Sequence, residues 1–360
     1  MSQKDSVERN FGITLLLTSM CDTGCSHCMD SSTIHNPTHF PKEMAEEIMR
    51  EVRQKGWNFL AFLTGGGEPL MHPDFLGVVD VFGEYEKTVS VGMVTSGFLE
   101  GDVSREFNLR EFLQRPYVPE SHVEQSFHLY HPSFSDRFVN MVKLLQEIRE
   151  RSLMNVRMCL SFENCEESWN KLERTIQSAA DEIGGDYYAL PGGFTENEQP
   201  NFSIVERNLG RGNWHFDWIA EKESLLISRC YVIRNNRDGG ILLNIRPIPF
   251  DNIGRGKKIQ ESAWSQFVCG IFLDHKDFFS TRLSVDFHGY VYPEYCCAGG
   301  HMRLGRVGQD SMEEMLLKGY RIFQRLPSII LADKRMFKWG TYEVCKLCQQ
   351  IVAERGIELA

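Results

Sequence analysis

Three cysteines lie close together near the start of the chain, at spacings of four and three residues. They are Cys21, Cys25 and Cys28, and they follow an apolar, strand-like segment that begins at Phe11. Thiolates are preferred ligands of iron–sulfur clusters and of zinc. In a cluster of four irons, three protein ligands leave one iron open to bind a reactant. The spacing therefore predicts a thiolate-ligated metal centre on a loop after the first strand.

A glycine-rich segment after the second apolar segment bears on the choice of metal. It reads Gly65-Gly66-Gly67-Glu68-Pro69. A zinc site would need a fourth ligand, which one of three nearby histidines could supply: His27, His35 or His39. Zinc leaves the glycine-rich segment without a role, so the pattern favours an iron–sulfur cluster.

Alternating helical and strand patterns predict the elements that position these motifs. The helical spacing of apolar residues predicts helices over 41–55, 73–85, 104–114, 135–151 and 166–183. Strands are predicted at the first apolar segment and over 60–64, 89–95, 123–129, 156–161 and 241–248. Such alternation is typical of parallel βαβ units with right-handed crossovers. We therefore predict an α/β fold with a partial (β/α)6 TIM barrel, whose chemistry lies at the carboxyl ends of the strands.

The spacing of Cys21, Cys25 and Cys28 resembles the radical S-adenosylmethionine (SAM) superfamily. His27 matches the usual aromatic position before the third cysteine, and Gly65-Gly66-Gly67-Glu68 resembles the superfamily's Gly-Gly-Glu motif. The resemblance implies a [4Fe-4S] cluster held by the three cysteines, with the amino and carboxylate groups of SAM on its open iron. It also implies that the Gly-Gly-Glu motif holds the SAM amino group.

Three further segments resemble SAM-facing motifs of this superfamily. Thr95-Ser96-Gly97 resembles the third-strand motif, commonly Ser-Asn-Gly, with Ser96 in place of the amide. Residues 126–131 align with a fourth-strand motif of a peptide-modifying branch, and His128 stands where an acidic residue is usual; a purely structural histidine is the alternative. Arg255 lies in a turn that resembles one near the adenine.

The C-terminal region contains a second group of cysteines. A predicted β-hairpin around an Asp-x-x-Gly turn leads to Cys296 and Cys297. From about residue 265 the pattern resembles the twitch domain, a shortened relative of the SPASM domain. The resemblance implies an auxiliary [4Fe-4S] cluster with four ligands: Cys269, Cys296, Cys345 and Cys348. A structural zinc site with the same ligands is the alternative.

These patterns predict two domains. Residues 1–255 would form the radical SAM partial barrel, and residues 256–360 a small α+β auxiliary-cluster domain. Residues 184–240 form a long insertion before the last barrel strand, with glycine-rich turns and an aromatic cluster. The insertion is either a surface subdomain or a lid over the substrate.

The adjacent pair Cys296-Cys297 suggests a reaction. Neighbouring residues on a strand point to opposite faces, so the two would not both ligate one cluster. In radical SAM peptide epimerases such a pair supplies one ligand and one hydrogen-atom donor, although here Glu294 and Tyr295 separate Pro293 from the pair. We therefore expect Cys296 to be a ligand and Cys297 the donor, with the opposite assignment open.

The resemblance implies a reaction on a ribosomally synthesised precursor peptide. A 5′-deoxyadenosyl radical would remove a Cα hydrogen from an L-residue, and Cys297 would return a hydrogen to give the D-residue. One alternative is an oxidative enzyme that uses the auxiliary cluster to crosslink a peptide or dehydrogenate a small molecule. Another is a non-catalytic iron–sulfur redox protein, for which a SAM amine pocket has no use.

Composition and charge limit the classes of binding partner and the cellular compartment that we expect for this protein. A net charge of −10 argues against nucleic acid, and no apolar segment is long enough to span a bilayer. The first residues lack a signal-peptide core, and eleven cysteines, an odd number, fit metal ligation in a reducing compartment. We expect a cytoplasmic enzyme with a flavodoxin- or ferredoxin-type electron donor. The residues before the first strand leave no room for a separate leader-binding domain, so the barrel rim, the insertion or another protein would bind the peptide.

Overall fold

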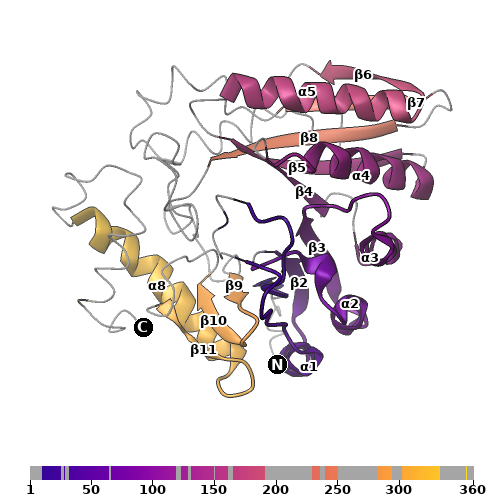
Figure 1. Cartoon of the computed structure of the whole chain (residues 1–360). Helices are drawn as coiled ribbons and strands as arrows, with labels where there is room; N and C mark the ends of the chain where they lie inside the picture. The colour runs from indigo at the N-terminus through magenta and orange to yellow at the C-terminus, as the bar shows by residue number, and fades with distance from the viewer. Residues whose placement is uncertain are drawn as a thin grey trace, which may run out of the picture.

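Eleven strands form a single sheet in the described part of the chain (Figure 1). The computed structural model describes residues 10–25, 28, 32–64, 66–118, 123–128, 131–149, 151–160, 165–190, 229–235, 240–249, 282–293, 302–332 and 354. The strand order is β11-β10-β9-β1-β2-β3-β4-β5-β8-β7-β6. Neighbouring strands from β9 to β8 in this order run parallel, and antiparallel strands extend the sheet at both edges.

The six predicted barrel strands are all present and adjacent. They are β1 (Asn10–Leu15), β2 (Asn58–Leu63), β3 (Thr88–Thr95), β4 (Val123–His128), β5 (Arg151–Leu160) and β8 (Gly240–Pro249). Because they are parallel, their carboxyl ends meet along one edge of the sheet, called the carboxyl edge below. This confirms an α/β fold with a mostly parallel sheet, consistent with a radical SAM partial barrel.

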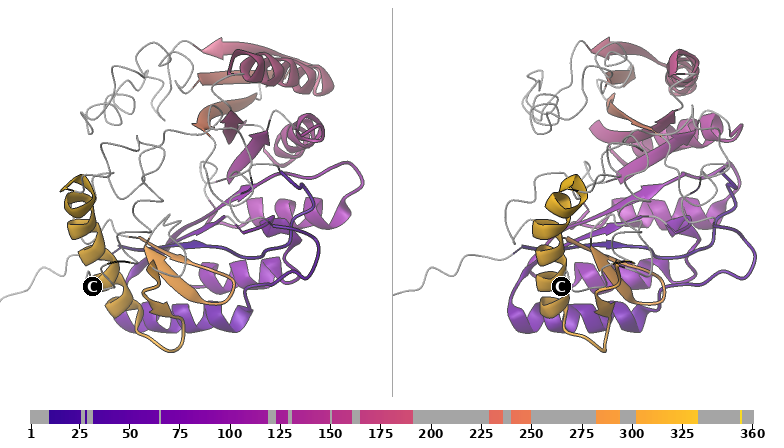
Figure 2. Two further views of the ribbon diagram at one scale, coloured as in Figure 1. Left: turned by 60° about the vertical axis from the view of Figure 1, so that its left-hand side comes forward. Right: turned by 90° about the vertical axis from the view of Figure 1, so that its left-hand side faces the viewer.

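Helices connect these strands and cover one side of the sheet (Figure 2). They are α1 (Lys42–Lys55), η1 (Pro69–Met71), α2 (Phe75–Gly83), α3 (Val103–Leu113), α4 (Phe134–Ile148) and α5 (Cys165–Glu182). Alternate residues of β2 are fully buried, and Phe59 packs on Phe82 of α2 at a ring distance of 5.4 Å. The intervening β2 residues are only half-buried. One face of β2 therefore packs against helices, and the opposite face is less completely covered.

The ends of the insertion are strands that the sequence pattern did not predict. β6 (Gly185–Leu190) and β7 (Arg229–Asn235) pair antiparallel and extend the sheet beyond β8. The predicted helix 135–151 also proves too long, since α4 stops at Ile148 and Arg151 already begins β5. Pairing along β8 explains this, because each residue from Arg151 to Leu160 has a partner there.

The predicted C-terminal hairpin is present and joins the main sheet. β9 (Arg282–Val285) and β10 (Tyr290–Pro293) are antiparallel, and β9 also pairs parallel with β1. β11 (Gly305–Arg306) pairs with β10, and the long helix α8 (Met312–Ala332) packs on β10 and β9. The predicted domain boundary at 255/256 lies outside the described residues. None of the described helices is long and apolar enough to cross a bilayer.

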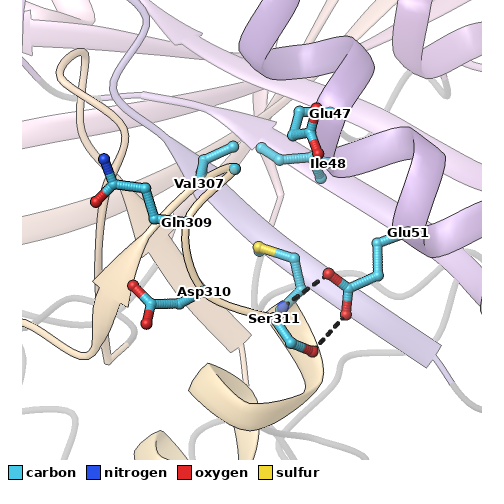
Figure 3. Close-up of a pocket in the computed structure, with 9 residues that line it drawn as sticks. Glu47, Ile48, Glu51, Val307, Gln309, Asp310 and Ser311 are labelled. Carbon is cyan, nitrogen blue, oxygen red and sulfur yellow. Dashed lines mark hydrogen bonds between the residues drawn. The ribbon is translucent and has the colours of Figure 1, made fainter.

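A residue of α1 caps the start of α8 (Figure 3). The Glu51 carboxylate accepts hydrogen bonds from the Ser311 hydroxyl at 2.8 Å and from the backbone N–H groups of Met312 and Glu313 at 2.9 and 3.1 Å. These amide groups lie at the positive end of the helix dipole, which favours a negative charge. Glu51 therefore ties the C-terminal helix to the first helix of the barrel.

A buried histidine predicts how stability depends on pH. The Asp74 N–H donates to His72 Nδ1 at 3.1 Å, so Nδ1 carries no proton, and Nε2 donates to the Phe40 carbonyl at 2.8 Å. Burial lowers the pKa of His72, and the neighbouring ring of His39 adds to this. The unfolded ring titrates near its ordinary pKa of about 6.5. The folded chain should therefore keep full stability above about pH 6.5 and lose it as the pH falls towards the lowered pKa.

Urea unfolding midpoints at pH 7.5 and 5.5 measure this effect. His72→Gln removes the titrating group, so its midpoint should change less between the two pH values than that of the wild-type chain. The exposed His35 provides a matched variant, His35→Gln, that should retain the wild-type pH dependence. An unchanged pH dependence in His72→Gln would contradict the prediction.

Candidate functional site

The loop with the first cysteines begins where β1 reaches the carboxyl edge. The Cys21 N–H donates to the Thr33 carbonyl at 3.3 Å, and the Thr33 N–H donates to the Ser19 carbonyl at 3.2 Å. A third bond, from the Ser19 N–H to the Thr38 carbonyl, measures 2.9 Å. These bonds close a loop between residues 19 and 33, called the cysteine loop below.

All three cysteines of this loop are described and half-buried. The Cys28 N–H donates to the Cys25 carbonyl at 3.3 Å, which turns the chain between the second and third thiol. Burial raises the pKa of the Cys21 thiol, and the charges of Glu68 and Asp22 raise it further. Among the residues that the structure describes, no three Cys, His, Asp or Glu side chains converge in a metal-binding arrangement. The loop thus carries the donors without placing the three thiols around a common centre.

Glu68 is the most completely hydrogen-bonded carboxylate near the loop. It is 2% exposed. One oxygen accepts from the Thr95 hydroxyl at 2.7 Å and from the Leu70 N–H at 3.2 Å; the other accepts from the Ser96 N–H and the Ser96 hydroxyl, both at 2.6 Å. Hydrogen bonds from residues at the end of β3 therefore hold the carboxylate of Glu68, which follows β2 in the chain, in one position.

Two glycines bring this carboxylate close to the cysteine loop. Gly66 forms a parallel bridge with Thr18 and has a φ of 70°, which side chains rarely adopt. A Cβ atom on Gly67 would lie 2.7 Å from the Met20 carbonyl carbon and 2.8 Å from its nitrogen. The next N–H, of Glu68, donates to the Met20 carbonyl at 2.8 Å. We call Gly66, Gly67 and Glu68 with Thr95 and Ser96 the Glu68 cradle.

The turn of the C-terminal hairpin also borders the cradle. A Cβ atom on Gly66 would lie 3.4 Å from the ring of Phe287, which sits between β9 and β10. Val285 accepts a hydrogen bond from the Leu16 N–H at 2.8 Å, directly before the cysteine loop. Residues far apart in sequence therefore close one side of the site.

Several predicted site residues lie outside the described part of the chain. They are Gly65, Arg255, Cys269, Cys296, Cys297, Cys345 and Cys348, together with His27. His128 ends β4 opposite Cys159 of β5, and its side chain is not described. Of the predicted SAM-facing residues, the structure thus brings together Gly66, Gly67, Glu68, Thr95 and Ser96, and their contact with SAM stays a prediction.

An ionic network around Asp22 was not predicted from the sequence: its two arginines are buried, and Asp22 itself is exposed. Asp22 lies between Cys21 and Cys25 and pairs with Arg105 of α3 and Arg137 of α4. Burial alone would raise the pKa of Asp22, but hydrogen bonding to Arg105 and the two positive charges outweigh it and hold the pKa below its usual value. An acidic residue between two cysteines was the available signal, but its partners come from two helices more than eighty residues away in sequence.

Two buried polar atoms near the cradle favour an additional polar group there. Arg105 Nη1 and Gln125 Oε1 have no hydrogen-bond partner among the described residues. Gln125 Nε2 donates to the Ser96 carbonyl at 3.4 Å, so this side chain adjoins the cradle. Buried polar groups normally have partners. Three thiols, a buried carboxylate and these two atoms together suit a thiolate-bound cluster beside a polar cofactor.

A comparison with family models decides the assignment of this region. Residues 15–115 match the model of the radical SAM superfamily. Residues 15–115 thus correspond to a radical SAM domain. The matched residues include the cysteine loop, the Glu68 cradle and α3. A [4Fe-4S] cluster and SAM are the cofactors that this domain implies.

Solved structures of proteins with bound AdoMet are similar to the chain at low identity. Hexahistidine-tagged anSMEcpe with bound AdoMet is 16% identical, with a TM-score of 0.44, over 85% of this chain and 80% of that one. Native anSMEcpe with bound AdoMet and Kp18Cys peptide is 14% identical, with a TM-score of 0.45 over the same shares. BtrN in complex with AdoMet and 2-DOIA is 11% identical, with a TM-score of 0.36, over 86% and 83%. No curated protein matches the sequence.

Proposed function

We propose that this radical SAM protein is a peptide epimerase acting on a ribosomally synthesised precursor. The observation that carries the radical SAM part is the Glu68 cradle, a buried carboxylate held by four hydrogen bonds directly beside a three-cysteine loop. The bound cluster and SAM would supply the radical that removes a hydrogen atom from a peptide Cα. Cys21, Cys25 and Cys28 would hold the cluster.

The residues of this chain would bind SAM and complete the reaction. Glu68, already fixed by Thr95 and Ser96, would accept hydrogen bonds from the SAM amino group, because a buried carboxylate favours an ammonium. Cys297 would donate a hydrogen atom to the planar Cα from the face opposite the one that lost it. That donation inverts the residue from L to D and leaves the hydrogen on Cα derived from a thiol. The resulting thiyl would be reduced by one electron and one proton, with the electron supplied through the auxiliary cluster.

The geometry of the C-terminal hairpin permits this role for Cys297. β10 runs back from the carboxyl edge, and Pro293 pairs with Leu283, two residues before the end of β9. The distance along the strand from the carboxyl edge back to Pro293 is therefore about 7 Å. Four further residues can span at most about 13 Å, so this length of chain is sufficient to bring a residue at position 297 back to the carboxyl edge.

The direction of β10 also favours a second candidate. Because β10 leads away from the carboxyl edge, Cys296 and Cys297 follow a strand that leaves the cysteine loop behind. An oxidative enzyme would need neither cysteine at the barrel mouth, since its auxiliary cluster would only accept an electron from the substrate radical. This second candidate would crosslink or dehydrogenate its substrate, and it predicts that Cys297 is dispensable.

Turnover in deuterated water separates the two candidates. Reconstituted enzyme would be incubated anaerobically with SAM, dithionite and the short peptides encoded near its gene, and the products read by mass spectrometry. Thiols carry deuterium in this solvent, so an epimerised residue should gain one non-exchangeable deuteron. Cys297→Ala should abolish that gain while 5′-deoxyadenosine still forms, and Cys230→Ala, a buried cysteine of β7, should behave like wild type.

Loss of two hydrogens without uptake of deuterium would contradict the epimerase and support the oxidative enzyme. A Cys297→Ala variant that still gives the deuterated D-residue would contradict the role of this thiol. Failure of the wild-type protein to cleave SAM with any of these peptides, despite a loaded cluster, would contradict both candidates.

A further inference from the structure

Asp22 anchors the cysteine loop to two helices of the barrel. Its Oδ2 lies 2.6 Å from Arg105 Nη2 and 3.4 Å from Arg137 Nη2. Asp22 directly follows Cys21, the first thiol of the loop, so its two ion pairs restrain the backbone beside that thiol. Arg105 belongs to α3 and Arg137 to α4. The loop is therefore fixed from both of these helices.

Arg137 connects this anchor to the Glu68 cradle. Its Nη1 donates to the Ser96 hydroxyl at 3.2 Å and to the Gly97 carbonyl at 3.0 Å, and the side chain is only 2% exposed. The Ser96 hydroxyl in turn donates to Glu68. A continuous hydrogen-bonded path therefore runs from the cysteine loop to the carboxylate of the cradle.

Arg105 differs from Arg137 because one of its donors has no partner among the described residues. Arg105 is 5% exposed, and its Nε lies 3.0 Å from the Asp102 carboxylate while Nη2 faces Asp22. Nη1 is buried and has no acceptor in the described part of the chain. Leaving a buried donor unpaired costs about 1–3 kcal/mol, and more for a charged group. Such an atom beside a metal-ligating loop indicates an acceptor that arrives with the bound cofactor.

We propose that Arg105 is a positioning residue for the iron–sulfur cluster: it fixes the cysteine loop through Asp22, and its Nη1 donates a hydrogen bond to the sulfur atoms of the cluster unit. This inference rests on the radical SAM function proposed above and goes beyond it in naming a residue outside the cysteine and glycine-rich motifs. A cluster with three thiolate ligands is anionic and gains further negative charge on reduction. A buried cation and hydrogen bonds to sulfur stabilise the reduced state and raise the reduction potential.

Three variants separate the charge of Arg105 from its contacts. Arg105→Gln removes the charge, and Arg105→Lys keeps it while losing the double contact with Asp22 and Asp102. Asp22→Asn keeps Arg105 and weakens the anchor. Arg110→Gln is the matched control, because Arg110 also lies on α3 but pairs with the surface residues Glu106 and Glu147.

Three measurements would be made on the full chain after anaerobic reconstitution. They are the iron and sulfide content, the EPR spectrum of the dithionite-reduced protein with and without SAM, and a redox titration. Cys269→Ala/Cys345→Ala/Cys348→Ala would serve as the common background, so that the signal comes from the cluster of the cysteine loop alone. We expect Arg105→Gln to lower the reduced-to-oxidised ratio at a fixed potential tenfold, equivalent to 59 mV for a one-electron couple. Arg105→Lys should give a reduced-to-oxidised ratio between those of the background protein and Arg105→Gln, and both Arg105→Lys and Asp22→Asn should retain about half of the iron of the background protein.

The outcomes distinguish this inference from the proposed function. An Arg105→Gln variant with unchanged iron content, potential and SAM-dependent EPR spectrum overturns the inference. If Arg105→Gln does not fold, an Arg105→Lys variant with the iron content, potential and SAM-dependent EPR spectrum of the background protein overturns it, because lysine keeps the charge but makes neither the double contact nor the Nη1 hydrogen bond. A parent protein that assembles no SAM-responsive cluster overturns both the radical SAM function and the inference. A SAM-responsive cluster with the expected Arg105 effects but no change in any peptide supports the inference and overturns the epimerase alone.

Discussion

Glu68→Gln should weaken SAM binding by about 10- to 100-fold. A hydrogen bond to a charged group contributes about 1.5–3 kcal/mol, and about 1.4 kcal/mol corresponds to a factor of ten in affinity. The substitution preserves shape, but the amide has one acceptor oxygen where the carboxylate has two. The NH2 group would also face the Ser96 N–H or the Thr95 hydroxyl, which donate to the carboxylate at 2.6 and 2.7 Å. The variant therefore loses the electrostatic attraction for the SAM ammonium group. It also loses part of the hydrogen bonding that holds the side chain in place.

Equilibrium dialysis of SAM against anaerobically reconstituted protein measures this loss. The matched control is Glu46→Gln, an exposed residue of α1, which should bind SAM with wild-type affinity. Iron content should stay near the wild-type value in both variants, because Glu68 is not a cluster ligand in this assignment. Undiminished SAM affinity in Glu68→Gln, with iron loaded, would remove the cradle from the SAM site.

Gly67→Ala should disrupt the contact between the cradle and the cysteine loop. The new Cβ would meet the backbone of Met20, at 2.7 Å from its carbonyl carbon and 2.8 Å from its nitrogen, so one of the two segments must move. Overpacking of this kind costs about 1–3 kcal/mol, and the upper end applies because the neighbour is backbone. We expect the thermal midpoint to fall by several degrees, the iron content to fall by more than half, and SAM cleavage to be lost.

Thermal unfolding by circular dichroism, iron analysis and 5′-deoxyadenosine formation test these effects together. Gly101→Ala is the matched control, since Gly101 has a φ of 85° but no atom of the described residues within 4 Å of an added Cβ. It should lose a similar or smaller amount of stability through backbone strain while keeping its iron. A Gly67→Ala protein with normal iron and normal SAM cleavage would show that the two segments need no such close approach.

Local sequence patterns predicted the central strands and the cradle because the relevant signals are short-range. The apolar segment of β2 ends at the glycine-rich motif, and β3 ends at Thr95 and Ser96, so parallel pairing alone brings these motifs to one edge. The C-cap of α1 was equally local: Gly56 has a φ of 65° and ends the helix where the pattern predicts.

Long-range pairing accounts for what the sequence did not predict. β6 pairs with β7, and β7 pairs with β8, and no local pattern marks the insertion as an extension of the sheet. The same holds for Arg105, which reads as an ordinary polar residue on a helix until its partner Asp22 is known. Ion pairs between distant segments carry no period or spacing along the chain.

The pairing of β1 with β9 has a consequence for how the protein is made. Gly12 pairs with Arg282, so the strand that leads into the cysteine loop lacks one neighbour until β9 has been synthesised. At about 5–20 residues per second, translation delays this pairing by roughly a quarter of a minute to a minute. During that interval the thiols of the nascent chain would be exposed to oxygen and to competing metals. We therefore expect iron and sulfide to be incorporated most effectively after the ribosome has passed the C-terminal hairpin, and slow translation of the second half should lower the yield of loaded enzyme.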